Sequence, residues 1–126
     1  MPGLVIREAQ LKALAEAATD EFVATAAAHL TEHYPRTSNL LGEIGLKDAI
    51  RRGLAKARRY GIDDEYDALR FLNLMFALGF EFDSDPKYPW ARHYLTDSSY
   101  GPRAKLDAVT QFALETTQPE GADSQQ

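Results

Sequence analysis

The residues best suited to chemistry lie in one short stretch, His29-Leu30-Thr31-Glu32-His33, which fits the H-x-x-E-H spacing of inverted zinc peptidases. On a helix, His29 and His33 share a face one turn apart, as zinc binding requires. Only three positions specify this motif, and such peptidases need a third protein ligand from another helix. The simpler interpretation is a helix end whose histidines are partly buried or meet the helix dipole. The sequence therefore predicts no metal and no cofactor, and a small zinc-dependent hydrolase using His29, Glu32 and His33 is the alternative.

Other patterns that carry chemistry are missing. The run Asp83-Ser84-Asp85-Pro86 lacks the glycine and the further oxygen ligands of a calcium loop, so it is expected to be a turn closed by Asp side chains. The chain has no cysteine, no G-x-S-x-G elbow and no glycine-rich phosphate loop. We therefore expect a protein that is not an enzyme.

The basic residues are concentrated in one predicted helix. The formal net charge of the chain is −5, which argues against nonspecific binding of DNA. Residues 46–60 nevertheless hold six basic side chains and one acidic one. The helix that follows Gly61-Ile62 is apolar all round, so it cannot be an exposed recognition helix. We expect the basic face to dock an acidic protein partner, and a nucleic-acid-binding regulator is the second alternative. The candidate residues on this face are Arg51, Arg52, Lys56 and Arg59.

Apolar residues that recur every three or four positions predict a helical chain. The first helix is expected over residues 7–34, with a possible kink near 18–20, and Pro35 ends it. Residues 35–45 are expected to be a connector with one short helical turn. Further helices are predicted over residues 46–60, 63–80, 89–95 and 102–116.

Two glycines near the middle of the chain carry structural information. Gly53 interrupts the apolar side of helix 46–60, where it lowers helix propensity, so a second helix is expected to approach it closely. Gly61 with Ile62 fits a Schellman cap at the end of the same helix. Residues 69–80 are apolar almost all round, which is typical of a central helix.

These elements predict an all-α fold, as a compact bundle-like or orthogonal arrangement of four main helices and one short helix around a central apolar helix. Residues 1–116 are expected to form a single helical domain, and residues 117–126 a disordered tail. No apolar run is long enough to span a bilayer and no signal-peptide core is present, so we expect a cytoplasmic protein.

The irregular segment Phe82–Ala91 contains two large apolar residues in an otherwise polar, proline-rich stretch. Phe82 and Trp90 are expected either to anchor the segment on the core or to meet a partner. Asp83 is expected to accept hydrogen bonds from backbone N–H groups and Asp85 to cap the short helix that follows. We expect Trp90 to be mostly buried, with an exposed hot spot as the rival possibility. Phe82, Asp83, Asp85 and Trp90 are thus further candidates for protein binding.

The order of several short motifs resembles that of a group of small bacterial helical proteins. The motifs are Gln10 to Leu14, His29-Leu30 with Pro35, Ala57 to Ile62, Leu74-Met75 with Gly79, and Phe82 to Ala91. The last of these is the most specific, and the resemblance covers roughly residues 8 to 110. Such proteins tend to be encoded beside toxins or spike components of type VI secretion systems. The resemblance implies an accessory role, as adaptor or chaperone of a secreted effector or as immunity protein, and a partner that is an effector or spike component.

Overall fold

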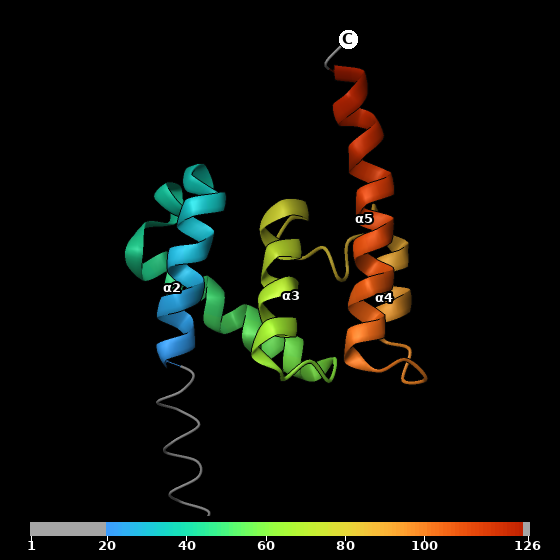
Figure 1. The fold of residues 1–126 in the computed structure, drawn as a ribbon, viewed down its shortest axis with the longest axis horizontal. Helices are drawn as coiled ribbons and strands as arrows, with labels where there is room; N and C mark the ends of the chain where they lie inside the picture. Colours follow the sequence, from blue (N-terminus) through green and yellow to red (C-terminus); the bar gives the residue numbers. More distant parts are fainter. Residues whose placement is uncertain (1–19, 125–126) are drawn as a thin grey trace, which may run out of the picture. The chain divides into compact units, whose positions relative to one another are not determined.

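The computed structural model describes residues 20–124, with side chains to residue 116. Within that range every regular element is a helix and no strand occurs, so the predicted all-α fold is confirmed (Figure 1). The first helix runs through residues 20–33, and its predicted part before Asp20 lies outside the described residues. The other helices are α2 (Pro35–Arg59), α3 (Glu65–Leu78), α4 (Pro89–Leu95) and α5 (Pro102–Ser124). None of the described helices is long and apolar enough to cross a membrane.

The chain divides into two units, residues 1–51 and residues 52–126, and α2 passes from one to the other. In the first unit, the helix of residues 20–33 buries the side chains of Val23, Ala26 and Leu30. The Ser38 hydroxyl on α2 is buried and donates to the Leu30 carbonyl at 3.2 Å. This bond ties the start of α2 to the end of the preceding helix.

The predicted connector over residues 35–45 is wrong. Pro35 does follow the end of the first helix, but it is also the first residue of α2, where a missing N–H and a fixed φ favour helix. The only interruption within α2 is Gly42, whose φ of 75° and ψ of 171° kink the helix. This φ lies in the left-handed region that a side chain disfavours, so glycine is the suitable residue there.

The second unit is built around α3. Its inward side chains Phe71 and Leu72 are fully buried, and α3 packs against α5. On the α2 segment of this unit, a Cβ placed on Gly53 would lie 2.6 Å from Leu72 Cδ2 and 2.7 Å from Met75 Sδ. The predicted close approach of a helix to Gly53 is therefore confirmed, and the helix is α3.

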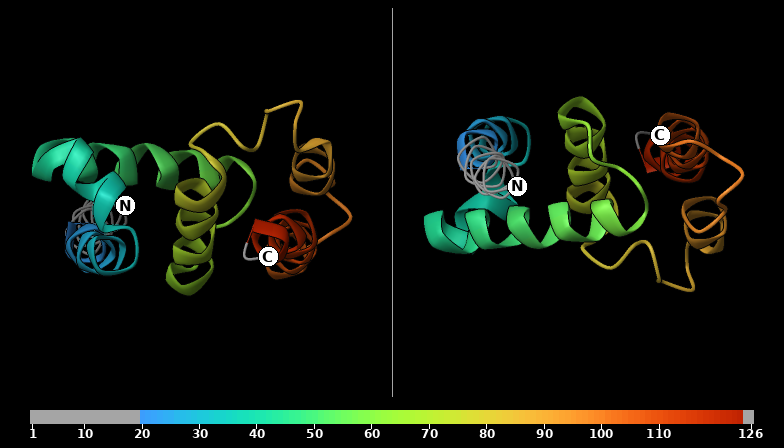
Figure 2. Two further views of the ribbon diagram at one scale, coloured as in Figure 1. Left: turned by 90° about the horizontal axis from the view of Figure 1, so that it is seen from above. Right: turned by 90° about the horizontal axis from the view of Figure 1, so that it is seen from below.

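Helix ends in the second unit follow local rules. Ile62 N–H donates to the Ala57 carbonyl at 2.9 Å across Gly61, as the predicted Schellman cap requires. The start of α4 at Pro89 and of α5 at Pro102 agree with the predictions. α5 lies beside α4 (Figure 2) and continues to Ser124, beyond the predicted end at Thr116.

Candidate functional site

The histidine pair predicted from the H-x-x-E-H motif does exist, because the rings of His29 and His33 lie with centroids 4.3 Å apart. His29 is half-buried, whereas Glu32 and His33 are exposed. Among residues 20–124, no group of three or more His, Cys, Asp or Glu side chains is placed to hold a metal ion. Within the described part of the chain, His29 and His33 therefore have no third side chain that could complete a zinc site for the alternative hydrolase.

Lys56, a candidate on the basic face, belongs instead to an internal polar cluster. Its ammonium donates to the Phe80 carbonyl at 2.9 Å and to Asp83 Oδ1 at 2.9 Å, and it reaches Glu81 Oε1 at 3.3 Å. Asp83 was predicted to accept from backbone N–H groups. That prediction is wrong, because its two carboxylate oxygens accept from the Lys56 ammonium and from the Tyr60 hydroxyl, the latter at 2.6 Å.

The cluster is partly buried and affects the ionisation of Tyr60. Burial, the hydrogen bond to Asp83 and the charge of that carboxylate together raise the pKa of Tyr60 to about 12. Nearby, the buried Lys105 ammonium donates to the Tyr60 carbonyl at 2.9 Å. These contacts fasten the end of α2 to the loop after α3 and to α5, which is a structural role.

The remaining basic candidates lie at the surface. Arg51 pairs with Asp20 at 3.3 Å, and both side chains of that pair are largely exposed. Arg52 and Arg59 are exposed as well. With Lys56 held internally, the surface of this face is formed by arginines.

Two candidates in the segment Phe82–Ala91 are not surface residues. Phe82 is 0% exposed and packs on Phe71 with ring centroids 5.3 Å apart, and Asp83 is buried in the cluster described above. Neither side chain can meet a partner in this fold, so their assignment as protein-binding residues is corrected to an anchoring role. Asp85 accepts a hydrogen bond from the Lys87 backbone N–H at 2.9 Å, which closes the predicted turn. The prediction that Asp85 caps the short helix is wrong, because the N-cap residue of α4 is Tyr88 and no side chain caps this helix.

Trp90 lies in a row of aromatic side chains on α4, α5 and their flanking loops. The order of contacts, with ring centroids 5.4 to 5.7 Å apart, is Tyr88, Trp90, Phe112, Tyr94 and Tyr100. We call these five residues the aromatic row. Trp90 was expected to be mostly buried, but it is half-buried, with its ring stacked on Phe112.

The aromatic row combines apolar rings with polar tips. Tyr100 is exposed and the other four side chains are half-buried. No hydrogen bond within the described residues engages the hydroxyls of Tyr88, Tyr94 and Tyr100 or the indole N–H of Trp90. Such a surface can bury ring edges against a ligand while the polar tips bond to it.

Sequence reasoning found Trp90 but not the other members of the row. Trp90 and Tyr94 are four residues apart on a helix, and this spacing is a signal that places both rings on one face. Phe112 and Tyr100 are brought to that face only by the packing of α5 against α4, which no local pattern reveals.

Comparison with known proteins assigns no relatives. No protein-family model matches the chain, and no curated protein and no solved structure is significantly similar to it.

Proposed function

We propose that this chain is a non-catalytic protein-binding module and that the aromatic row is the surface that meets its partner. The observation that carries the proposal is the row of five contacting rings at the surface of the second unit. Trp and Tyr are the side chains most enriched at the energetic centres of protein interfaces. Rings that already support one another lose little conformational entropy when a partner covers them.

A protein partner fits this surface better than a stacked sugar or base. Trp90 already has one face covered by Phe112, at an interplanar angle of 14°, and Tyr94 is stacked on Tyr100 at 16°. Each stack covers one ring face, which leaves fewer open faces for sugars and bases that bind by stacking, and leaves ring edges and polar tips for a ligand to meet. A protein partner offers both kinds of group at once. Its apolar side chains can pack on the ring edges, and its backbone carbonyls can accept hydrogen bonds from the tyrosine hydroxyls and the indole N–H.

The partner class comes from the resemblance of the sequence motifs. We propose that the protein acts in the bacterial cytoplasm as an adaptor or chaperone for a type VI secretion effector, or as its immunity protein. Its partner would be the secreted effector or a spike component.

The experiment measures binding of the purified full chain to the effectors and spike components encoded beside its gene, by titration calorimetry. The double variant Tyr94→Ala/Tyr100→Ala should weaken binding by about a hundredfold. The matched control is Tyr66→Ala, which removes a tyrosine that is 65% exposed on α3. Binding that survives the double variant would reject the aromatic row, and failure of every such partner to bind would reject the function.

A further inference from the structure

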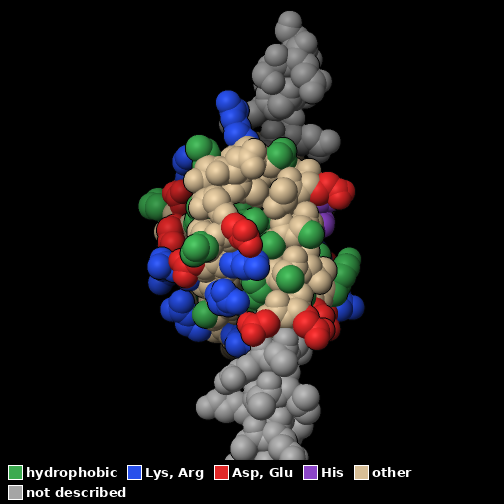
Figure 3. Space-filling view, turned by 90° about the vertical axis from the view of Figure 1, so that its left-hand side faces the viewer, with side chains coloured by type: hydrophobic (Ala, Val, Ile, Leu, Met, Phe, Trp, Pro, Cys, Tyr) green, Lys and Arg blue, Asp and Glu red, His purple; other side chains and the backbone are tan. Residues whose placement is uncertain are grey.

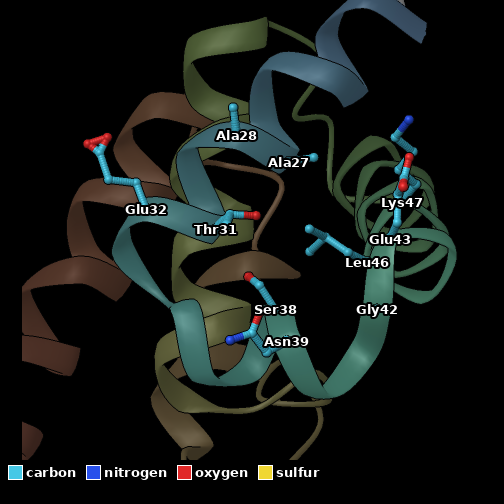
Figure 4. A pocket seen from close by; sticks show the side chains of 10 residues that line it. All are labelled: Ala27, Ala28, Thr31, Glu32, Ser38, Asn39, Gly42, Glu43, Leu46 and Lys47. Carbon is cyan, nitrogen blue, oxygen red and sulfur yellow. The ribbon is translucent and has the colours of Figure 1, made fainter.

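The first unit contains a groove between residues of its first helix and of α2 (Figure 4), with a volume of about 650 Å³. Charged side chains of both signs line it, namely Glu32, Glu43 and Lys47. A surface of mixed charge favours no single class of partner. The part of α2 that belongs to the second unit, residues 52–59, instead carries charges of one sign, so its exposed face can select a partner.

Three arginines lie around one small residue on this part of α2. Arg52, Arg58 and Arg59 are exposed, and so is Ala55, which lies between Arg52 and the other two in the sequence. At 3.6 residues per turn, the four positions fall within about 120° of the helix circumference. Arg52 and Arg59 are two turns apart, which is about 10.5 Å along the helix axis. We call these four residues the arginine face.

The arginine face has three positive charges and no acid of its own. Residues 49–62 contain no Asp or Glu. Lys56 lies on the same stretch, but its ammonium is held by the Phe80 carbonyl and by Asp83, so it is not part of the exposed face. Glu81 reaches this part of α2, and its carboxylate is bound to the Lys56 ammonium at 3.3 Å. The chemistry that complements the arginine face is therefore a group of carboxylates.

We propose that the arginine face docks an acidic α-helix of a protein partner. Carboxylates at positions i and i+7 of such a helix are two turns apart and match the spacing of Arg52 and Arg59. A third carboxylate at i+8 faces Arg58. Guanidinium groups bind carboxylates through paired N–H···O bonds, which gives these contacts a defined geometry. The small side chain of Ala55 lets the two helices approach closely. The arginine face lies on a different helix from the aromatic row, so it is a second contact surface that does not depend on the proposed function.

A nucleic acid fits this surface less well than an acidic helix. Duplex DNA carries one phosphate charge per about 1.7 Å of its axis, so its backbone would extend beyond the arginines. Asp63, Asp64 and Glu65 are exposed directly after the turn that ends α2, and they would repel it. Acidic side chains also lie beside basic ones on the face shown in Figure 3. A helix with a few carboxylates can meet the arginines alone.

The first test measures binding of two labelled peptides to the full chain by fluorescence anisotropy. One is an alanine-based, stapled helical peptide with glutamates at i, i+7 and i+8. The other has the same composition with its glutamates spread around the helix. We expect the first peptide to bind more tightly, and more weakly as salt is added. Equal binding of the two peptides, or tighter binding of a short DNA duplex at the same salt concentration, would overturn the proposal.

Variants of the chain show whether the arginine face binds the first peptide. Arg52→Gln/Arg59→Gln should raise the dissociation constant of that peptide about tenfold. The matched control is Arg36→Gln/Arg92→Gln, which removes two exposed arginines elsewhere and changes the net charge equally. The control should bind the peptide as the natural protein does. An equal loss in both double variants would mean that only the net charge matters, and would reject the arginine face.

A second test adds an acid and leaves every arginine in place. Ala55→Glu puts a carboxylate at the centre of the arginine face, where it can pair with Arg59 one turn further along α2. Binding of the first peptide should fall about tenfold or more. The control is Ala77→Glu, which adds the same charge at an exposed alanine of α3. Both positions are exposed, so circular dichroism should show the natural helix content in both variants. Unchanged binding in a folded Ala55→Glu chain would contradict the proposed surface.

Discussion

The Lys56 ammonium lies 2.9 Å from Asp83 Oδ1, and the two side chains are only 15% and 7% exposed. This pair joins α2 to the loop after α3 within the second unit. Removing one partner of a buried pair leaves an unpaired charge that water cannot fully solvate, whereas an exposed pair contributes little. Through this pair, the basic part of α2 contributes to the stability of the fold.

Lys56→Met should lower the free energy of unfolding by about 3 kcal/mol, because Asp83 is left buried without its cation. Arg51→Ala, which breaks the exposed pair with Asp20, should cost about 0–1 kcal/mol. Urea denaturation measures both. Charge reversal at Arg52 and Arg59 should likewise leave the midpoint unchanged, and adding Lys56→Glu should lower it. Equal midpoints for Lys56→Met and Arg51→Ala would contradict this view of the pair.

Gly53 and Gly45 on α2 should respond in opposite directions to alanine. A Cβ at Gly53 would meet Leu72 Cδ2 at 2.6 Å and Met75 Sδ at 2.7 Å, so Gly53→Ala should overpack the core and cost about 1–3 kcal/mol. A Cβ at Gly45 would meet only Leu41 Cβ at 3.5 Å, so Gly45→Ala should stabilise by about 0.5–1 kcal/mol. The melting temperatures of the two variants test this difference. A higher melting temperature for Gly53→Ala would show that the side chains of Leu72 and Met75 move aside without strain.

Features with a local cause could be predicted from the sequence, and features that join distant segments could not. The helix starts at Pro89 and Pro102 depend only on proline at the first helical position. Pro35 was misinterpreted because the same residue ends one helix and begins the next. For Asp83, turn rules supply only backbone partners, while its actual partners are Lys56 of α2 and Tyr60 just after it, more than twenty residues away. The aromatic row likewise depends on how α5 packs on α4.

Tyr60 should make the protein sensitive to alkaline pH. Burial and the Asp83 carboxylate raise the pKa of Tyr60 from its ordinary 10.0 to about 12, because ionisation would place a phenolate beside a carboxylate. A raised pKa in the folded state gives stability that is complete below pH 10 and is lost as the pH rises from 10 to about 12. The melting temperature should therefore fall across this range more steeply in the natural protein than in Tyr60→Phe. Lysines titrate in both proteins, so parallel curves would mean that Tyr60 ionises as freely in the folded chain as in the unfolded one.

Phe82 and Trp90 should differ in their contribution to stability although both are large aromatic residues of the same segment. Phe82 is fully buried against Phe71, so Phe82→Ala should cost about 3–5 kcal/mol through the cavity that it leaves. Trp90 is half-buried and stacks on Phe112 at the surface of α5, so Trp90→Ala should cost about 1–2 kcal/mol.

Fluorescence tests the same difference without unfolding the protein, because Trp90 is the only tryptophan. Its emission should be partly quenched by acrylamide, between the values of a buried and a free indole. Phe112→Leu should shift the emission to the red and increase quenching, since it removes the ring that covers one face of Trp90. Leu114→Ala, two residues further along α5, is the control and should leave the spectrum unchanged. Emission that resists acrylamide, together with a loss of stability as large as for Phe82→Ala, would place Trp90 in the core and remove it from the proposed binding surface.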